Sequence, residues 1–258
     1  MRKVRLVAHN VPEFRIDDLA ESKYGSEFWN SVENGEWESQ QLTELCELGR
    51  RGEWFFIDIG ASNGVYSLVL AALGNQVLAI EPDFEQFSAM STNLKLNPSF
   101  PIIAQRAIVG VGNSLKLSPY SLDVKKNKTS EIKVLDFKEL LRKERNRIIK
   151  IDIEGGEWQL FRSKGLIHSL EKAGKTELFL SPHIGFFSAT YSKGMLQRIK
   201  FRIGVLRELV TLYRISRRAT SRRYQGVEVT PFELLKFDRV FGGPGLRHHI
   251  RLSFGSEV

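Results

Sequence analysis

The hydrophobic pattern of the chain alternates between short apolar runs and longer segments with helical character. The apolar runs that predict strands are 54–59, 76–80, 102–109, 148–153 and 176–180. The segments rich in helix-forming residues are 65–73, 85–96 and 157–170. Strands that alternate with helices predict an α/β fold with a mostly parallel sheet covered on both faces.

The two ends of the chain depart from this alternation. Residues 236–241 and 247–254 are strand-like and flank a Gly-Gly-Pro-Gly turn, which predicts an antiparallel C-terminal hairpin that closes the sheet. The polar stretch 118–131 predicts a solvated loop or hairpin. We therefore expect a helical or irregular lead-in over 1–53 and one α/β domain over 54–258.

Composition limits the class of protein. The chain has 258 residues, of which 42% are hydrophobic, and this is enough for one substantial core. Cys46 is the only cysteine, so an intrachain disulfide is excluded. The N-terminus lacks the apolar stretch of a secretion signal, and no apolar run of about 18 residues occurs. These features predict a soluble, cytoplasmic protein.

Positive charge is concentrated in one insertion, at about 186–226. Residues 193–223 carry ten Lys or Arg and one acid, whereas the net charge of the whole chain is +8. The apolar residues that recur on one helical stripe are Leu196, Ile199, Ile203, Leu206, Val210 and Tyr213. We expect an amphipathic helix that packs this stripe on the domain and leaves its basic face in solvent. Contact with an anionic membrane or an acidic substrate is the alternative, and nucleic acid is a less favoured partner.

A glycine-containing loop follows the first predicted strand. The string DIGASNG at 58–64 lies where an open α/β sheet binds its ligand. Glu81 ends the next strand, 21 residues after Gly60, and a carboxylate at that spacing can accept hydrogen bonds from both hydroxyls of a ribose. Ser62 replaces the second glycine of a dinucleotide-binding loop, and Asp58 would repel phosphates but attract the cationic groups of S-adenosylmethionine (SAM). The loop therefore favours SAM over NAD.

Three strings resemble the FkbM-type family of SAM-dependent methyltransferases: FIDIGASNGVYSL at 56–68, AIEPD at 79–83 and KIDIEGGEW at 150–158. The resemblance runs from about Phe28 to about His183 and includes the pair Trp37-Glu38. It implies a class I SAM-methyltransferase (Rossmann-like) fold and, for many members, methylation of a hydroxyl oxygen.

The resemblance also indicates which residues bind the cofactor. They are Asp58, Gly60, Ala61, Ser62, Asn63, Gly64, Glu81, Pro82, Arg106 and Ala107. By position, the loop residues should line the methionine end of SAM, and Glu81 should hold the ribose. Arg106 and Ala107 should lie near the adenine.

Charged side chains gather after the fourth predicted strand. Strand alternation places Asp152 and Glu154 on one side, and Glu157 begins the next helix. Methyl transfer to an alcohol needs a positioned nucleophile and a base that takes its proton. Asp152, Glu154, Glu157 and His183 are therefore the candidate catalytic residues. Such a group can also hold a divalent ion, but nothing in the spacing demands a metal, and we predict none.

Two other functions must be weighed against a methyltransferase. The string GASNG satisfies G-x-S-x-G, and Ser62, Asp152 and His183 follow the chain order of an α/β-hydrolase triad. That interpretation is disfavoured, because the motif ends the first core strand and leaves Glu81 without a task. A non-catalytic or RNA-directed SAM-binding protein that uses 193–223 is the second alternative. No Asn-Pro-Pro-Tyr or Asp-Pro-Pro-Tyr string follows the fourth strand, so we favour oxygen as the acceptor atom, in a small molecule, a sugar or a lipid-linked glycan.

Overall fold

A computed structural model describes most of the chain. The described residues are 1–17, 25–52, 54–111, 132–142, 146–154, 156–163, 165–183, 195–235 and 249–255. The chain divides into two compact units. The first contains 1–108, 127–133 and 146–150, and the second contains 109–126, 134–145 and 151–258.

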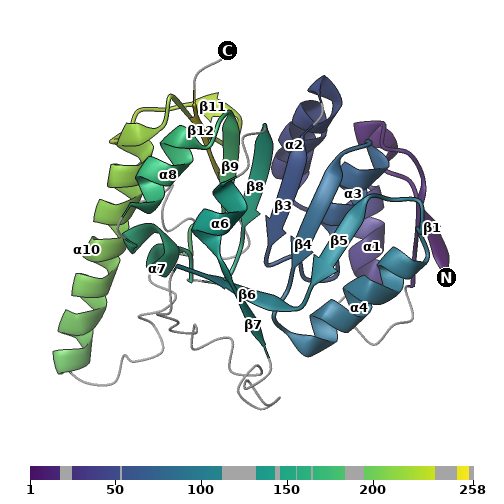
Figure 1. The fold of residues 1–258 in the computed structure, drawn as a ribbon, viewed down its shortest axis with the longest axis horizontal. Helices are drawn as coiled ribbons and strands as arrows, with labels where there is room; N and C mark the ends of the chain where they lie inside the picture. The colour runs from purple at the N-terminus through teal and green to yellow at the C-terminus, as the bar shows by residue number, and fades with distance from the viewer. Residues whose placement is uncertain are drawn as a thin grey trace. The chain divides into compact units, whose positions relative to one another are not determined.

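The first unit is built on parallel strands (Figure 1). Strands β3 (Phe55–Ile59), β4 (Gln76–Ile80) and β5 (Ile102–Gln105) pair in that order, all parallel. Strands β3 and β4 are almost continuously buried, which explains why their sequences read as apolar runs without alternation. The helices that follow them are α3 (Val65–Ala72) and α4 (Phe84–Lys95). The side chain of Asp83 caps α4 by accepting hydrogen bonds from the backbone N–H groups of Glu85 and Gln86.

The N-terminal lead-in of this unit contains a hairpin that the sequence did not predict. Strands β1 (Arg2–Val4) and β2 (Phe14–Ile16) pair antiparallel, with a 3-10 turn η1 (Val7–His9) between them. Two asparagines, one in α4 and one just after it, hold the second strand: Asn97 accepts from Arg15 N–H at 2.8 Å, and Asn93 accepts from Asp17 N–H at 2.9 Å. Helices α1 (Ser26–Glu33) and α2 (Ser39–Arg51) complete the lead-in.

The predicted strand 102–109 is interrupted at Arg106. Strand β5 ends before this residue, and β6 (Ala107–Gly110) belongs to a separate two-stranded sheet with β7 (Lys133–Asp136). Helix α6 (Phe137–Leu141) follows, and then the buried strand β8 (Arg147–Ile151). The predicted loop 118–131 lies outside the described residues.

The second unit carries a run of four antiparallel strands. Strand β9 (Thr176–Leu180) pairs with β12 (Ile250–Phe254), β12 with β10 (Ser221–Tyr224), and β10 with β11 (Val227–Glu228). The last predicted strand is therefore present and antiparallel, but its described partners are β9 and β10. Residues 236–241, its predicted hairpin partner, lie outside the described residues.

The helices of the second unit correct one sequence prediction. The helix expected over 157–170 is two helices, α7 (Glu157–Arg162) and α8 (Leu166–Lys172). The chain leaves the helical conformation at Ser163 and resumes after Gly165, whose φ of +82° lies in the left-handed region that glycine adopts without strain. The long helix α10 (Met195–Arg218) packs on α7, α8 and the 3-10 turn η3 (Glu233–Leu235).

Candidate functional site

The loop after β3 is held against the end of β4. The backbone N–H groups of Gly60 and Ala61 both donate to the carbonyl of Ile80, at 3.0 and 3.1 Å. The backbone turns through the left-handed region at Gly60, Ser62 and Gly64, with φ of +80°, +52° and +88°. A side chain at Gly64 would also place its Cβ 2.9 Å from Met90 Cγ. The last position is therefore restricted to glycine both by backbone conformation and by space.

The structure joins the loop to the acid that the sequence paired with it. Glu81 is 7% exposed, and its two carboxylate oxygens accept backbone hydrogen bonds from Ser62 at 2.8 Å and from Asp83 at 2.9 Å. Burial raises the pKa of Glu81 to about 7, although these two N–H donors act in the opposite direction. Each oxygen has a further lone pair, so the carboxylate can accept additional donors such as ribose hydroxyls.

Asn63 supplies a second observation that fits a bound cofactor. The residue is buried, and its backbone carbonyl accepts from the side chain of Asn93 at 3.1 Å. Its own side-chain Nδ2 has no hydrogen-bond partner among the described residues. A buried donor without a partner is costly, and an acceptor group on SAM would remove that cost. The residues of the loop therefore fit the cofactor.

The residues predicted to lie near the adenine occupy the break between β5 and β6. Arg106 donates from Nε to the carbonyl of Pro82 at 3.4 Å, and its guanidinium lies over the ring of Phe84, 5.2 Å from the centroid. Ala107 is fully buried. The structure thus brings Arg106 and Pro82 together, and their contact with adenine stays a prediction.

Asp58 has charged and polar partners that the sequence analysis missed. Its carboxylate accepts from the Ser67 hydroxyl at 2.8 Å and lies 3.8 Å from the ammonium of Lys150, and both charged groups are buried. The Lys150 ammonium also lies 5.1 Å from the ring centroid of Tyr66. The signal that could have identified Lys150 is a lone lysine inside the apolar strand β8.

The Trp37-Glu38 pair reaches the same region. The hydroxyl of Tyr66 donates to the carboxylate of Glu38, and the rings of Trp37 and Tyr66 are 5.0 Å apart. Tyr66 is the second residue of α3, directly after the glycine loop. The two residues included in the family resemblance therefore help to anchor the helix that begins at the loop.

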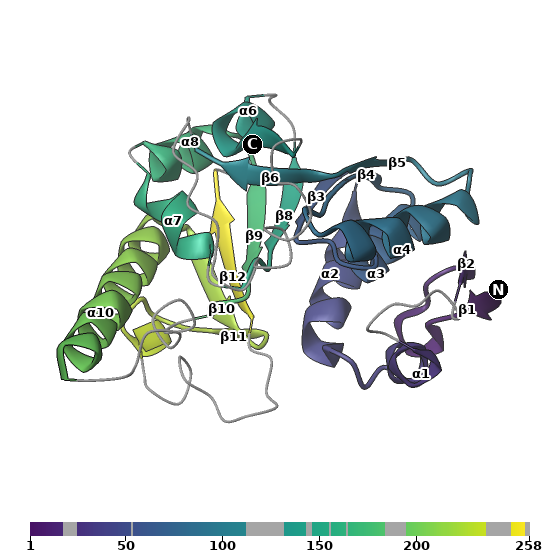
Figure 2. The same cartoon turned by 90° about the horizontal axis from the view of Figure 1, so that it is seen from below.

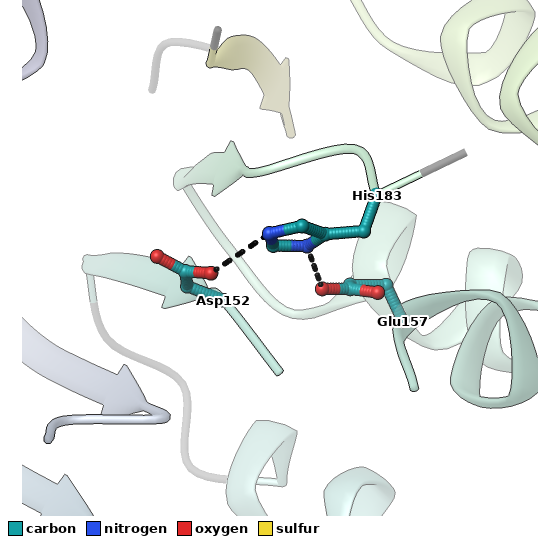
Figure 3. A group of neighbouring side chains, drawn as sticks. All are labelled: Asp152, Glu157 and His183. Carbon is teal, nitrogen blue, oxygen red and sulfur yellow. Dashed lines mark hydrogen bonds and ion pairs between the residues drawn. The ribbon is translucent and has the colours of Figure 1, made fainter. Parts of the chain in front are cut away.

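A second group of functional side chains lies in the second unit, after β8 and β9. The ends of these segments are joined by a backbone hydrogen bond from Ser181 N–H to the Ile151 carbonyl, at 3.1 Å. Figure 3 shows the imidazole of His183 between the carboxylates of Asp152 and Glu157. His183 Nδ1 lies 2.9 Å from Glu157 Oε1, and Nε2 lies 3.6 Å from Asp152 Oδ1. The structure thus brings together three of the four predicted catalytic residues.

The three side chains differ in their exposure to solvent. Glu157 is fully buried, and its Oε1 also accepts the backbone N–H of Ile153 at 3.0 Å. The side chains of His183 and Asp152 are 27% and 24% exposed. Glu157 therefore fixes the ring from inside the protein, and the Nε2 edge, beside Asp152, is the edge that a substrate can reach.

Charge decides the protonation state of His183. Burial lowers the pKa of the imidazole, but the hydrogen bond to Glu157 and the charges of Glu157, Asp152 and Glu154 outweigh burial and raise the pKa to about 9. Glu154 is exposed and has a φ of +51°. Because β8 ends at Ile151, strand alternation does not direct Asp152 and Glu154, contrary to our prediction, and Glu154 acts on the imidazole through its charge.

The same side chains can be considered as a metal site. Asp152, Glu157 and His183 each offer one ligand atom, and these atoms all lie within 4.8 Å of one another. Carboxylates and imidazole are ligands of several divalent ions. The geometry is therefore compatible either with a protonated imidazole between two carboxylates or with a cation in its place.

Comparison with solved structures finds methyltransferases. The METTL16 MTase domain is 15% identical over 84% of this chain and 67% of its own, with a TM-score of 0.40. A ribosomal protein L11 methylase from Lactobacillus delbrueckii is 15% identical over 83% and 78%, with a TM-score of 0.37. Precorrin-6y C5,15-methyltransferase from Geobacter metallireducens is 14% identical over 76% and 75%, with a TM-score of 0.33. A search of the curated proteins found no match.

A family comparison agrees with the sequence motifs. The profile of the methyltransferase FkbM domain matches residues 58–178, a stretch that begins at the first residue of the glycine loop and includes Glu81 and Glu157. The fold is α/β, with the parallel strands β3, β4 and β5 in its central sheet and the helices α3 and α4 after β3 and β4. Residues 58–178 thus match the methyltransferase FkbM domain, a domain whose cofactor is SAM.

Proposed function

We propose that this protein transfers the methyl group of SAM to a hydroxyl oxygen of a small molecule, a sugar or a lipid-linked glycan. The observation that carries the proposal is the position of His183. Its Nδ1 is bonded to the buried Glu157, and its Nε2 faces the partly exposed Asp152 at 3.6 Å. An alcohol must lose its proton during methylation, and this arrangement supplies an oriented base for it.

The roles of the three residues follow from their hydrogen bonds. With a pKa of about 9 the imidazole of His183 is mostly protonated at neutral pH, so it acts as a base in its neutral form, whose share grows as the pH rises toward 9. In that form one nitrogen is a donor and the other an acceptor. Because Glu157 can only accept, it fixes the hydrogen on Nδ1 and leaves the lone pair on Nε2. A hydroxyl placed at Nε2 donates its proton there, and Asp152 then stabilises the imidazolium that forms. In this proposal Glu157 is a positioning residue.

The first unit supplies the cofactor site in this proposal. SAM, when bound, provides the methyl group and carries it on a sulfonium. Glu81 would accept from the ribose hydroxyls, and Asn63 Nδ2 would donate to the methionine end. The loop conformation is fixed by its own backbone hydrogen bonds to Ile80, so the site is organised before the cofactor binds.

A hydrolase receives no support from the described side chains. The Ser62 hydroxyl donates to Gln86 Oε1 at 3.1 Å, and both nitrogens of His183 face carboxylates. The serine and histidine are therefore engaged with other partners. A hydrolase would also make no use of the further acceptor capacity of the Glu81 carboxylate, which a nucleoside would use.

The decisive experiment measures transfer of labelled methyl from SAM to a panel of alcohols, sugars and glycolipids. His183→Asn should reduce turnover by at least about a hundredfold and leave the affinity for SAM unchanged. His168→Asn is the matched control, because His168 also faces a carboxylate, Glu171 at 3.5 Å, but lies on the surface. Methylation of an amine or of RNA, with no oxygen acceptor accepted, would refute O-methylation.

Treatment with a chelator distinguishes a general base at His183 from a metal ion bound by the same three residues. If His183 acts as the base, EDTA should not change the turnover of the parent protein. Loss of turnover in EDTA, restored by Mg²⁺ or Mn²⁺, would assign the same three residues to a cation and would overturn the role of Nε2 given above.

A further inference from the structure

Helix α10 has a buried face and, opposite it, an exposed face with apolar side chains that the packing of the described chain does not explain. The helix contacts α7, α8 and η3, and its buried face contains Glu208, Thr211, Leu212, Ile215 and Ser216. Three residues of the stripe that the sequence predicted to pack on the domain point outward instead, and the side chains of Leu196 and Ile199 lie outside the described part. Ile203, Leu206 and Val210 are 45%, 60% and 49% exposed. Figures 1 and 2 show this helix with α7 and α8 along one of its sides.

The outer face continues onto the turn that follows β11. Phe232 is 73% exposed, and its ring lies 5.5 Å from that of Tyr213 on α10. The guanidinium of Arg217 lies 5.8 Å from the centroid of the same tyrosine ring. Exposed aliphatic side chains and an exposed aromatic ring are thus gathered next to a cation. A contiguous exposed apolar patch of this kind marks an interaction surface.

Arginines lie beside the exposed apolar residues of α10, and the acidic residue of this helix, Glu208, is on the buried face and does not neutralise their charge. Arg207, Arg214 and Arg217 are exposed and, at about 100° per residue, fall on the same face as Ile203 and Val210. Burial lowers the pKa of Arg162 in α7, and the charge of the buried Glu208 acts in the opposite direction, so Glu208 interacts with Arg162 on the inner side of the helix. The outer face is therefore both apolar and positively charged.

Two other arginines of the segment have structural roles. Arg222 donates to the carbonyls of Ser216 and Ala219, each at 2.6 Å, and so caps the end of α10. Arg218 pairs with Glu171 at 3.3 Å. These two cations hold the helix to its own unit, so an experiment on the outer face should leave them in place.

We propose that the outer face of α10, defined here as Ile203, Leu206, Arg207, Val210, Arg214, Arg217 and Phe232, binds the surface of an anionic membrane. Aliphatic side chains gain free energy in the acyl region near the headgroups, and arginines beside them bind lipid phosphates. RNA would use the arginines but would gain little from Ile203, Leu206 and Val210, which cannot stack on bases as aromatic rings do. The helix lies on the surface, because no helix in the described part of the chain is long and apolar enough to cross a membrane.

The test is co-flotation of the intact protein with vesicles of phosphatidylcholine alone, or of phosphatidylcholine and phosphatidylglycerol in equal amounts. The parent should bind only the second kind, and added salt should weaken binding. The variant R207Q/R214Q should bind roughly 30-fold more weakly, at about a factor of five for each cation. The variant L206Q/V210Q should lose at least about tenfold.

A matched control distinguishes an effect of the outer face from an effect of the lower net charge of the protein. The variant R51Q/R142Q removes two exposed arginines from α2 and from the end of α6 and should bind vesicles like the parent. SAM affinity and melting temperature should be unchanged in all three variants, which verifies folding. Absence of binding to anionic vesicles would overturn the proposal, as would equal losses in the control. Binding to RNA that depends on Arg207 and Arg214 but not on Leu206 and Val210, without vesicle binding, would assign the face to nucleic acid instead.

Discussion

Replacing Glu81 by Gln should remove a pH dependence from cofactor binding. The carboxylate is buried, and burial raises its pKa to about 7 in spite of the N–H groups of Asp83 and Ser62. Ribose hydroxyls donate more strongly to a charged carboxylate than to a neutral one. If Glu81 holds the ribose, SAM therefore binds best to the ionised form, and binding below about pH 7 releases a proton.

The size of the effect follows from the pKa. At about pH 6, one unit below a pKa of about 7, roughly nine copies in ten carry the proton. Deprotonation then costs about 1.4 kcal/mol, so the Kd for SAM should be about tenfold weaker at pH 6 than at pH 8. Glu81→Ala, which removes the acceptor entirely, should weaken binding at least about tenfold even at pH 8.

Titration calorimetry in two buffers of different ionisation enthalpy measures both the Kd and the protons released. The amino group of the ligand titrates in the same range, but its contribution remains in Glu81→Gln and can be subtracted. Glu139→Gln is the control for charge, since Glu139 is an exposed partner of Arg142. A parent that releases no more protons than Glu81→Gln would refute the ribose role of this carboxylate.

Three further perturbations test the geometry of each unit. His183 has a raised pKa of about 9, so the stability that its positive charge contributes is fully present below about pH 6.5 and is lost as the pH rises through about 9. Denaturant unfolding should therefore show the parent to be more stable than His183→Asn at pH 6.5 and nearly as stable as the variant above pH 9. A difference in unfolding free energy that does not change with pH would contradict this. Lys150→Met should lower the unfolding free energy by about 3–5 kcal/mol, because the buried Asp58 carboxylate loses the ammonium beside it. A loss as small as that of a surface ion pair such as Arg51 with Glu47 would show that groups other than Lys150 stabilise the carboxylate. Gly64→Ala should lower the unfolding free energy by roughly 1–3 kcal/mol more than Gly74→Ala does. Both glycines have φ near +90°, but only a side chain at position 64 would contact Met90. Equal melting temperatures of the two variants would argue against that contact.

Much of the first unit could be predicted from the sequence. Strand β4 has the predicted bounds, as does β9 in the second unit, because buried parallel or central strands are short apolar runs with clear ends. The link between the loop and Glu81 could be predicted from spacing, since adjacent parallel strands bring their carboxyl ends together. The structure adds that the link is a direct hydrogen bond from Ser62.

The pattern failed where tertiary contacts override it. Nothing in the apolar run 102–109 marks the break at Arg106, whose side chain is held by the carbonyl of Pro82 and the ring of Phe84. The pairing of Asp58 with Lys150 joins strands far apart in the sequence, and periodicity contains no information on it. The hairpin of β1 and β2 depends on Asn93 in α4 and Asn97 just after it, two polar side chains that a hydrophobic pattern does not detect.

Helix α10 shows why the most hydrophobic stripe of a helix is not always the buried one. Its inner face includes Glu208, Thr211 and Ser216, and two of these satisfy their polar atoms locally: the Thr211 hydroxyl donates to the Arg207 carbonyl at 2.7 Å, and the Ser216 hydroxyl to the Tyr213 carbonyl at 2.9 Å. Polar side chains that are satisfied in this way can be buried at little cost. The large aliphatic residues Ile203, Leu206 and Val210 lie on the outer face, where they are exposed, so packing within the described chain does not explain them. Selection against aggregation should remove such residues unless they are used, so the surplus of apolar side chains beside arginines is itself an argument that the outer face has a partner.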